Sequence, residues 1–147
     1  MFDPEDFAKL GHRMVQNPCG FADSRTAISR AYYSAFLTAK RHLGLHFQWP
    51  KTAEIHDQIQ MLFVNCNSDS IKAIGRKLND LRGKRNDADY DLHARGVDRH
   101  DAQLQLGIAQ GVIDELNRLS ISPAEWDPII NEMKIYAKLT GGKFRIK

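Results

Sequence analysis

The chain has 147 residues, a length that suits one domain with a single buried core. Hydrophobic residues make up 42% of it and charged residues 27%, and it has no run of about 18 apolar residues that could span a membrane. The 21 Lys and Arg against 18 Asp and Glu give a net charge of +3, which excludes an acidic solvating tail and is too small to indicate nucleic-acid binding by itself. The acidic start lacks a basic stretch followed by an apolar run, so we expect no secretory signal and a cytoplasmic protein without membrane contact.

The two cysteines, Cys19 and Cys66, are too few for a disulfide scaffold and lack the CxxC spacing of zinc sites. One disulfide between them stays open as an alternative, but two reduced thiols are the simpler interpretation. His42 and His46 have the i,i+4 spacing of a metal pair, yet no third ligand accompanies them. We therefore expect two solvent-facing histidines and no metal or other cofactor.

The first two helical patterns lie in the amino-terminal third of the chain. Phe7, Leu10 and Met14 recur at helical spacing and predict a helix over residues 4–16, which ends at a break that starts at Asn17. A longer helix is expected from residue 22 or 23 to residue 43, where Gly44 would supply a left-handed stop. Its inner stripe has alanines at intervals of four, flanked by larger residues, and lets another helix approach closely: Ala27, Ile28, Ala31, Tyr32, Ala35, Phe36 and Ala39.

Two further helices are predicted in the middle third of the chain. The third follows Thr52 and carries apolar residues at helical spacing. The fourth is expected to begin at Ser68 or Asp69 and to reach Leu92, with a kink at Gly83.

The carboxyl-terminal third predicts the last two helices from their start signals. Asp98 is expected to cap a fifth helix that runs to about Leu119. A Ser cap, a Pro at the first helical position and an acid three residues after the Ser predict the start of a sixth helix at Ser122, Pro123 and Glu125.

Together these patterns predict an all-α fold, an up-and-down bundle of five to six helices in a single domain over residues 1–147. The bundle core is expected at about residues 20–119, with an extra carboxyl-terminal helix at 122–140. The basic tail at 141–147 has alternating apolar residues and is open to three interpretations: a frayed end, a short strand or a docking arm.

The residues that can carry chemistry gather near the end of the fourth helix. At 100° per residue, five polar or ionisable side chains share about a third of the helix circumference, and an arginine lies at the edge of that arc: Arg82, Asn86, Asp89, Tyr90 and His93, with Arg85. Arg can clamp a phosphate, and His or Tyr can transfer protons. The plainer interpretation is an ion pair between Arg85 and Asp89 one turn apart, with the Tyr90 ring seated in the bundle.

Two segments carry a resemblance to a known family. The sequence SRTAISRAYYSAF at residues 24–36 resembles the "SRAYYAAF" helix of small HEPN-domain proteins, the "higher eukaryotes and prokaryotes nucleotide-binding" helical domains. His56 and the sequence RNDADY at residues 85–90 resemble the family's next two landmarks, the second in its "RxxADY" form. The resemblance covers roughly residues 20–119. It implies a HEPN-like bundle that usually forms a homodimer and brings two copies of the motif together in a cleft.

Many members of that family are metal-independent ribonucleases, often toxins or antiviral defence effectors, neutralised by a minimal nucleotidyltransferase as antitoxin. Their motif is Arg, a polar residue, then His. Arg85 and Asn86 match it, whereas Tyr90 stands where the His would be, and the next histidine is His93. The resemblance implies catalytic roles for Arg85, Tyr90 and His93, with Arg85 on the scissile phosphate and Tyr90 or His93 as acid or base.

The same resemblance implies substrate-binding or positioning roles for Arg82, Asn86 and Asp89. Three functions fit these expectations. The first is a homodimeric, metal-independent endoribonuclease of a toxin–antitoxin or defence system, acting on RNA. The second is a non-catalytic module that binds a nucleotide, RNA or a partner such as a nucleotidyltransferase, which the missing motif histidine favours. The third is a scaffold whose polar stripe only stabilises a dimer.

Overall fold

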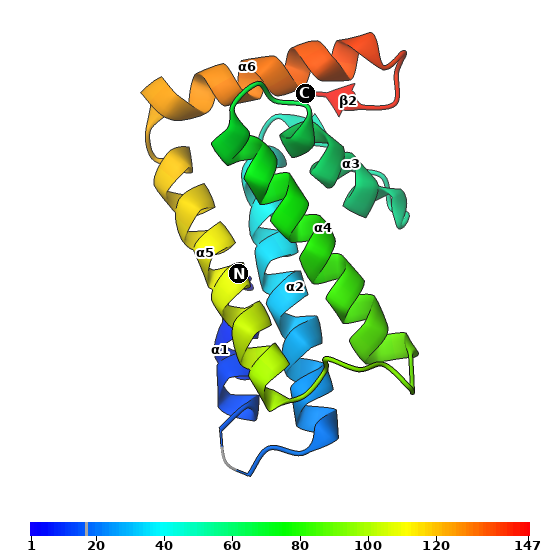
Figure 1. The fold of residues 1–147 in the computed structure, drawn as a ribbon. Helices are drawn as coiled ribbons and strands as arrows, with labels where there is room; N and C mark the ends of the chain where they lie inside the picture. The colour runs from blue at the N-terminus through cyan, green and yellow to red at the C-terminus, as the bar shows by residue number, and fades with distance from the viewer. Residues whose placement is uncertain (17) are drawn as a thin grey trace. The chain divides into compact units, whose positions relative to one another are not determined.

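The computed structural model describes residues 1–16 and 18–147, and it confirms the prediction of an all-α fold with six helices over these residues (Figure 1). One pair of two-residue strands accompanies the helices. The elements follow in the order α1 (Glu5–Met14), α2 (Phe21–Leu43), β1 (Phe47–Gln48), α3 (Glu54–Val64), α4 (Asp69–Tyr90), α5 (Arg99–Ser120), α6 (Pro123–Leu139) and β2 (Arg145–Ile146). Within the described residues no helix is both long and apolar enough to cross a membrane.

The described residues fall into two compact units. The first unit comprises Met1–Thr38 and Lys77–Asp114, and the second comprises Ala39–Arg76 and Glu115–Lys147. The helices α2, α4 and α5 contribute residues to both units. The candidate site residues all belong to the first unit.

In the first unit, α1 is buried through small residues rather than through the large apolar residues that recur at helical spacing. Ala8 and Gly11 are buried, whereas Phe7, Leu10 and Met14 are only half-buried. A Cβ added at Gly11 would lie 2.7 Å from Cδ2 of Leu106, so the glycine allows α5 a close approach. The predicted break after α1 starts at Asn17, which lies outside the described residues.

The inner stripe of α2 is confirmed in the first unit. Ala27, Ala31 and Ala35 are fully buried, and the rings of Tyr32 and Phe36 are 2% and 5% exposed. Buried hydroxyls on the same helix bond to its own backbone: Ser34 Oγ donates to the carbonyl of Ala31, and Thr38 Oγ1 donates to the carbonyl of Ser34. These bonds let small polar residues occupy the core without unpaired groups.

The predicted left-handed stop at Gly44 is wrong. Positive φ angles among the described residues occur at Gly96, Gly141 and Gly142. The amide of Gly44 instead donates to the carbonyl of Lys40 at 2.9 Å, which continues the helical pattern. A Cβ at Gly44 would lie 2.8 Å from the carbonyl oxygen of Lys40 and 3.3 Å from Nε1 of Trp49, so this glycine makes room for the helix backbone and a neighbouring side chain.

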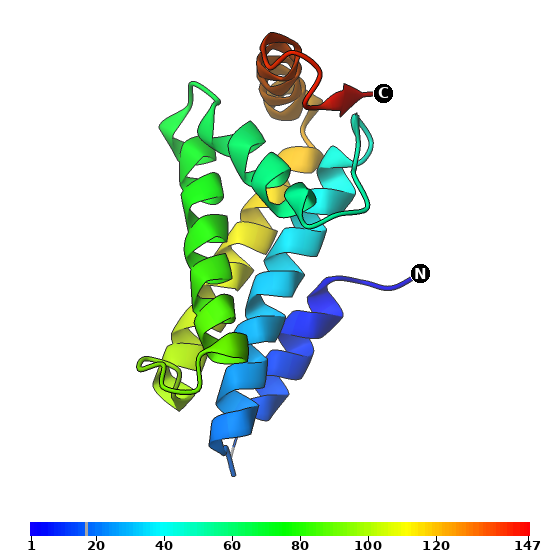
Figure 2. The ribbon, with the colours of Figure 1, turned by 90° about the vertical axis from the view of Figure 1, so that its right-hand side faces the viewer.

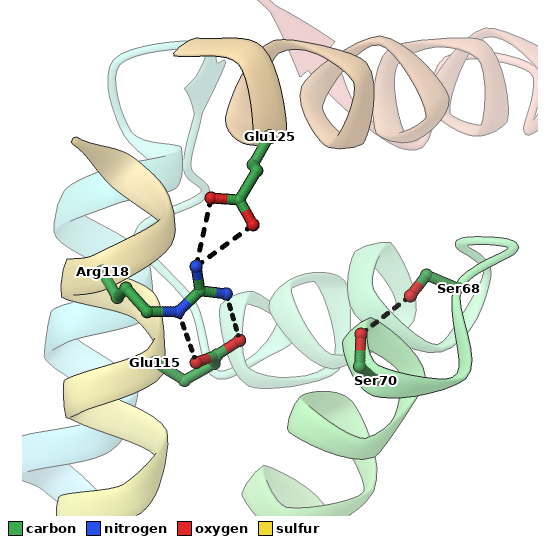
Figure 3. A network of polar contacts seen from close by, with 5 residues as sticks. All are labelled: Ser68, Ser70, Glu115, Arg118 and Glu125. Atoms are coloured by element: carbon green, nitrogen blue, oxygen red, sulfur yellow. Dashed lines mark hydrogen bonds and ion pairs between the residues drawn. The ribbon is translucent and has the colours of Figure 1, made fainter. Parts of the chain in front are cut away.

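Of the caps predicted for the last two helices, the one at α5 is confirmed and the one at α6 is wrong. Asp98 caps α5 as predicted, because its carboxylate accepts from the amide of Asp101 while Asp101 accepts from the amide of Asp98. Ser122 occupies the cap position of α6, but its side chain makes no capping hydrogen bond. Glu125 instead binds Arg118, which also holds Glu115 through paired hydrogen bonds (Figure 3). The predicted Ser–Glu capping pair is therefore wrong.

In the second unit the basic tail forms a short strand, which was one of its three open interpretations. β2 pairs antiparallel with β1, with Phe47 opposite Ile146. The left-handed Gly141 and Gly142 reverse the chain after α6. Nε2 of Gln58 donates to the carbonyl of Lys143, which ties the turn to α3.

Candidate functional site

Arg85 on α4 is the centre of the candidate site. Its side chain is 13% exposed, and acceptors surround its guanidinium. Nη2 donates to the phenol oxygen of Tyr33 on α2, Nη1 donates to Oδ1 of Asn86 at 2.6 Å, and Nε lies 3.4 Å from Oδ2 of Asp89. The guanidinium is therefore held in one orientation by side chains of two helices.

Three tyrosine rings also surround this cation. Cζ of Arg85 lies 5.0 Å from the ring centre of Tyr33, 5.4 Å from that of Tyr90 and 5.9 Å from that of Tyr32. Rings at these distances attract a cation through their quadrupole. Tyr32 is buried and Tyr33 is half-buried, whereas Tyr90 is 72% exposed. The expectation that the Tyr90 ring is seated in the bundle is therefore wrong, and this ring forms the outer wall of the cluster.

The charge of Arg85 is stabilised despite its burial. Burial by itself lowers the pKa of this guanidinium. The hydrogen bond to Tyr33 and the electrostatic attraction of Tyr33, Tyr90 and Asp89 outweigh that effect, so the pKa of Arg85 is raised above its ordinary value. Arg85 is therefore a cation at neutral pH.

Asp89 links the two helices that carry the cluster. Its Oδ2 accepts a hydrogen bond from Oγ of Ser29 on α2 at 3.2 Å and pairs with Arg85 on its own helix. The ion pair predicted from the i,i+4 spacing is thus present. Both side chains of this ion pair are largely buried, with 13% of Arg85 and 29% of Asp89 exposed. Water therefore screens the attraction between them only in part.

His93 reaches the site by a different route from the one that the helical spacing predicts. α4 ends at Tyr90, two residues before the predicted end at Leu92, so His93 lies in the following loop. The amide of His93 donates to Oδ1 of Asp91 at 2.9 Å. A pocket of about 530 Å³ in the first unit is lined by His93 and Asp89 together with Arg25 and apolar residues. His93 therefore shares a cavity with Asp89 although it does not share its helix face.

The helical spacing places the remaining predicted residues correctly on α4. Asn86 is exposed and contacts Arg85 through its amide oxygen. Arg82 is half-buried and lies one turn before this pair on the same helix. The structure thus brings Arg85, Asn86, Asp89 and Tyr90 into direct contact.

Tyr33 and Arg25 of α2 also contact α4, and neither was predicted as a site residue. Successive positions on a helix point about 100° apart, so Tyr32 is buried in the core while Tyr33 points to Arg85. Its presence in the SRAYYSAF segment was the available signal. Arg25 donates to the carbonyls of Ala88, Asp91 and Leu92 at 2.9, 2.9 and 3.4 Å. Arg25 thereby caps the carboxyl end of α4, and no sequence spacing indicates that role.

The described residues contain no group of three or more His, Cys, Asp or Glu side chains placed to hold a metal ion. Nε2 of His42 lies 2.9 Å from Oδ1 of Asn117, and its ring is edge-on to Trp126. The expectation of a solvent-facing His42 is therefore wrong. Cys19 and Cys66 are both free thiols, as the simpler interpretation predicts.

No family model matches the sequence, and neither the curated proteins nor the solved structures include one with significant similarity to the chain.

Proposed function

We propose that the chain is a HEPN-like module that binds a phosphate-bearing ligand, RNA or a nucleotide, through Arg85 and Tyr90. The observation that carries the proposal is the position of Tyr90, a residue that is 72% exposed and whose ring centre lies 5.4 Å from Cζ of Arg85. An exposed aromatic ring offers a base a stacking surface, and the adjacent guanidinium offers a charge to its phosphate. Asn86 beside them is exposed and offers a further polar group.

The surroundings of Arg85 favour binding over cleavage. Nη1, Nη2 and Nε each face an acceptor within the first unit, so the guanidinium is a fixed charge. RNA cleavage without a metal requires a base that takes the proton of the 2′-hydroxyl and an acid that gives one to the 5′-oxygen. Tyr90 and His93 would have to divide these roles, and they lie on different elements: the last residue of α4 and the loop after it.

A second candidate function is the metal-independent endoribonuclease, and one observation favours it. His93 and Asp89 line the same pocket, and Asp89 also pairs with Arg85. A carboxylate that pairs with a guanidinium and lines the same pocket as an imidazole can help to orient both groups around one phosphate. In a homodimer a second copy would supply another such set, and a nucleotidyltransferase antitoxin would be its natural partner in a toxin–antitoxin system.

One experiment separates these functions. Fluorescent single-stranded RNA is titrated with the purified chain in EDTA, and the same samples are run on a denaturing gel. We expect binding without cleavage, and Tyr90→Ala should weaken it by roughly 5- to 100-fold, the worth of one base–ring stack. Leu104→Ala, which shortens another exposed apolar side chain of the same unit, is the control.

The outcomes against the proposal are equally concrete. If neither RNA nor nucleotide binds, or if Tyr90→Ala binds like the control, the binding function is wrong. Cleavage in EDTA that His93→Ala abolishes would establish the ribonuclease instead. Light scattering on the same samples measures whether the chain is a dimer. An Arg85→Lys variant that weakens a dimer without changing RNA affinity would leave only the scaffold.

A further inference from the structure

Five side chains of the first unit form a row in which aromatic rings and guanidinium groups alternate: Phe7, Arg30, Tyr33, Arg85 and Tyr90. Cζ of Arg30 lies 4.5 Å from the ring centre of Phe7 and 5.5 Å from that of Tyr33. Cζ of Arg85 lies 5.0 Å from the same Tyr33 ring and 5.4 Å from Tyr90. In Figure 2, α1 and the end of α4 lie on either side of α2, and α2 carries Arg30 and Tyr33. We call these five residues the aromatic–arginine row.

Arg30 has an unpaired polar group that its contacts with the two rings do not explain. Its Nε is buried and has no hydrogen-bond partner among the described residues. Buried N–H groups are paired in the great majority of cases, and a cationic one is the most costly to leave unpaired. In the described part of the chain, the buried side-chain nitrogens without a hydrogen bond are Nε of Arg30 and Nε of Arg85. Both therefore belong to the two arginines that flank Tyr33.

Arg30 is less firmly held than Arg85. The guanidinium of Arg85 has acceptors in Tyr33 and Asn86, and its Nε faces Asp89. Arg30 instead lies against rings, which attract its charge without holding its N–H groups in one direction. Turning the guanidinium of Arg30 toward a ligand therefore breaks no hydrogen bond at Nε.

We propose that a single strand of RNA binds along the aromatic–arginine row, with Arg30 as a second phosphate-binding residue and Phe7 as a second base-stacking ring. This inference rests on the proposed function and extends its site from one nucleotide to a short strand. Alternating rings and cations suit the alternation of bases and phosphates in a single strand. Both guanidinium carbons lie within 5.5 Å of the Tyr33 ring centre, so one strand can contact both.

The ends of the row are accessible to such a strand. Tyr90 is 72% exposed at one end. At the other end Phe7 is half-buried, and the ring of Phe2, which is 53% exposed, lies edge-on to it with 4.9 Å between centres. The two ends thus offer aromatic surface to bases, and the arginines lie between them.

The test compares a ribonucleoside monophosphate with a single-stranded RNA of about eight nucleotides, a length within the usual site size of single-strand binders. Binding of both is measured over a range of salt concentrations for the wild-type chain, Arg30→Gln and Arg76→Gln. Arg76 is exposed and lies outside the row, so its variant controls for the loss of one positive charge. We expect Arg30→Gln to bind the mononucleotide as the wild type does. It should bind the octanucleotide at least tenfold more weakly, with a salt slope of log K reduced by about 0.7, the value for one lost phosphate contact.

Each other outcome contradicts a defined claim. If the wild type binds neither ligand, the proposed function fails, and the row fails with it. If the wild type binds both and Arg30→Gln behaves like Arg76→Gln, the row is wrong while the Arg85–Tyr90 site stands. If Arg30→Gln weakens both ligands equally, Arg30 supports the fold and does not bind RNA. Phe7→Leu keeps an apolar side chain and removes the ring, and it should also weaken the octanucleotide alone.

Discussion

Arg85 on α4 donates a hydrogen bond to the phenol oxygen of Tyr33 on α2, and the Tyr33 ring lies 5.0 Å from Cζ of the same arginine. Tyr33, which is 52 positions from Arg85 in the sequence, thus holds this arginine both with its phenol oxygen as an acceptor and with its ring as a π surface. The orientation of Arg85 toward Asp89 and Tyr90 therefore depends on α2 as much as on α4.

The Tyr33→Phe variant separates these two contacts, because it keeps the ring and removes the acceptor. We expect the free energy of unfolding to fall by roughly 1–2 kcal/mol, since Nη2 of Arg85 loses its partner in a largely buried place. Urea denaturation measures this change. Tyr136→Phe is the matched control, because Tyr136 contacts Phe144 ring to ring. A loss no larger than that of the control would mean that the Tyr33 hydroxyl contributes nothing to the stability of the fold.

Arg25 should hold the end of α4 and the loop that carries His93. In the wild type, Nη1 and Nη2 of Arg25 donate to three carbonyls. Arg25→Lys keeps the charge, but its single amine nitrogen cannot bond all three carbonyls as the planar guanidinium does. We expect the amide of Asp91, which closes the last turn on the carbonyl of Asp87, to exchange with solvent at least several-fold faster. Hydrogen exchange followed by NMR measures it, with Arg13→Lys on the exposed side of α1 as control. Unchanged exchange at Asp91 would contradict the capping role.

Two glycines of α4 should respond in opposite ways to alanine. A Cβ at Gly75 would lie 2.6 Å from Cγ1 of Val64 and 3.0 Å from Cβ of Phe63, whereas nothing lies within 4 Å of a Cβ at Gly83. We expect Gly75→Ala to destabilise the fold by about 1–3 kcal/mol. Gly83→Ala should stabilise it by about 0.5–1 kcal/mol, because alanine is the better helix former. Thermal unfolding of both variants tests this, and melting temperatures that shift in the same direction would refute the close approach at Gly75.

The two free thiols should differ in reactivity. Burial raises the pKa of the Cys66 thiol to about 12, and the nearby charge of Glu132 adds to the effect. Its Sγ also donates to the carbonyl of Leu62 at 3.3 Å. Since only the thiolate attacks disulfide reagents, Cys66 should stay unreactive in the folded chain at pH 8, and one thiol, that of Cys19, should react.

Titration with a chromogenic disulfide reagent counts these thiols with and without denaturant. Cys19→Ser should abolish the reaction of the folded chain, and Cys66→Ser should leave it unchanged. Reaction in the folded Cys19→Ser variant at pH 8 would show that Cys66 is neither buried nor protonated as described. Raising the pH toward 12 should increase any remaining Cys66 reactivity, because the thiolate fraction rises as the pH approaches the pKa.

The helices could be predicted because their signals are local. The start of α4 at Asp69 and the cap at Asp98 follow from residues within one turn of each helix end. The errors at Gly44 and Ser122 have one common cause. In both places a side chain from outside the helix end, Trp49 after α2 or Arg118 on α5, takes the space or the partner that the local rule assigns to the helix end.

The same distinction explains the candidate site. Helical spacing alone places Asn86 and Asp89 beside Arg85, because contacts one turn apart follow from the pitch of the helix. It cannot extend to His93, since the helix ends at Tyr90 and the pitch no longer applies. It is also silent about Tyr33, which belongs to another helix.

By itself, the sequence determined that this chain is helical, where most of its helices begin and end, and which polar residues share a face of α4. These properties depend on periodicity and on caps, which act over a few residues. Only the tertiary structure decided that Tyr33 and not Tyr32 accepts the hydrogen bond from Arg85. It also decided that Arg30 belongs to the aromatic–arginine row. The packing of α1 and α4 against α2 sets these contacts, and residues far apart in the chain meet only after that packing has formed.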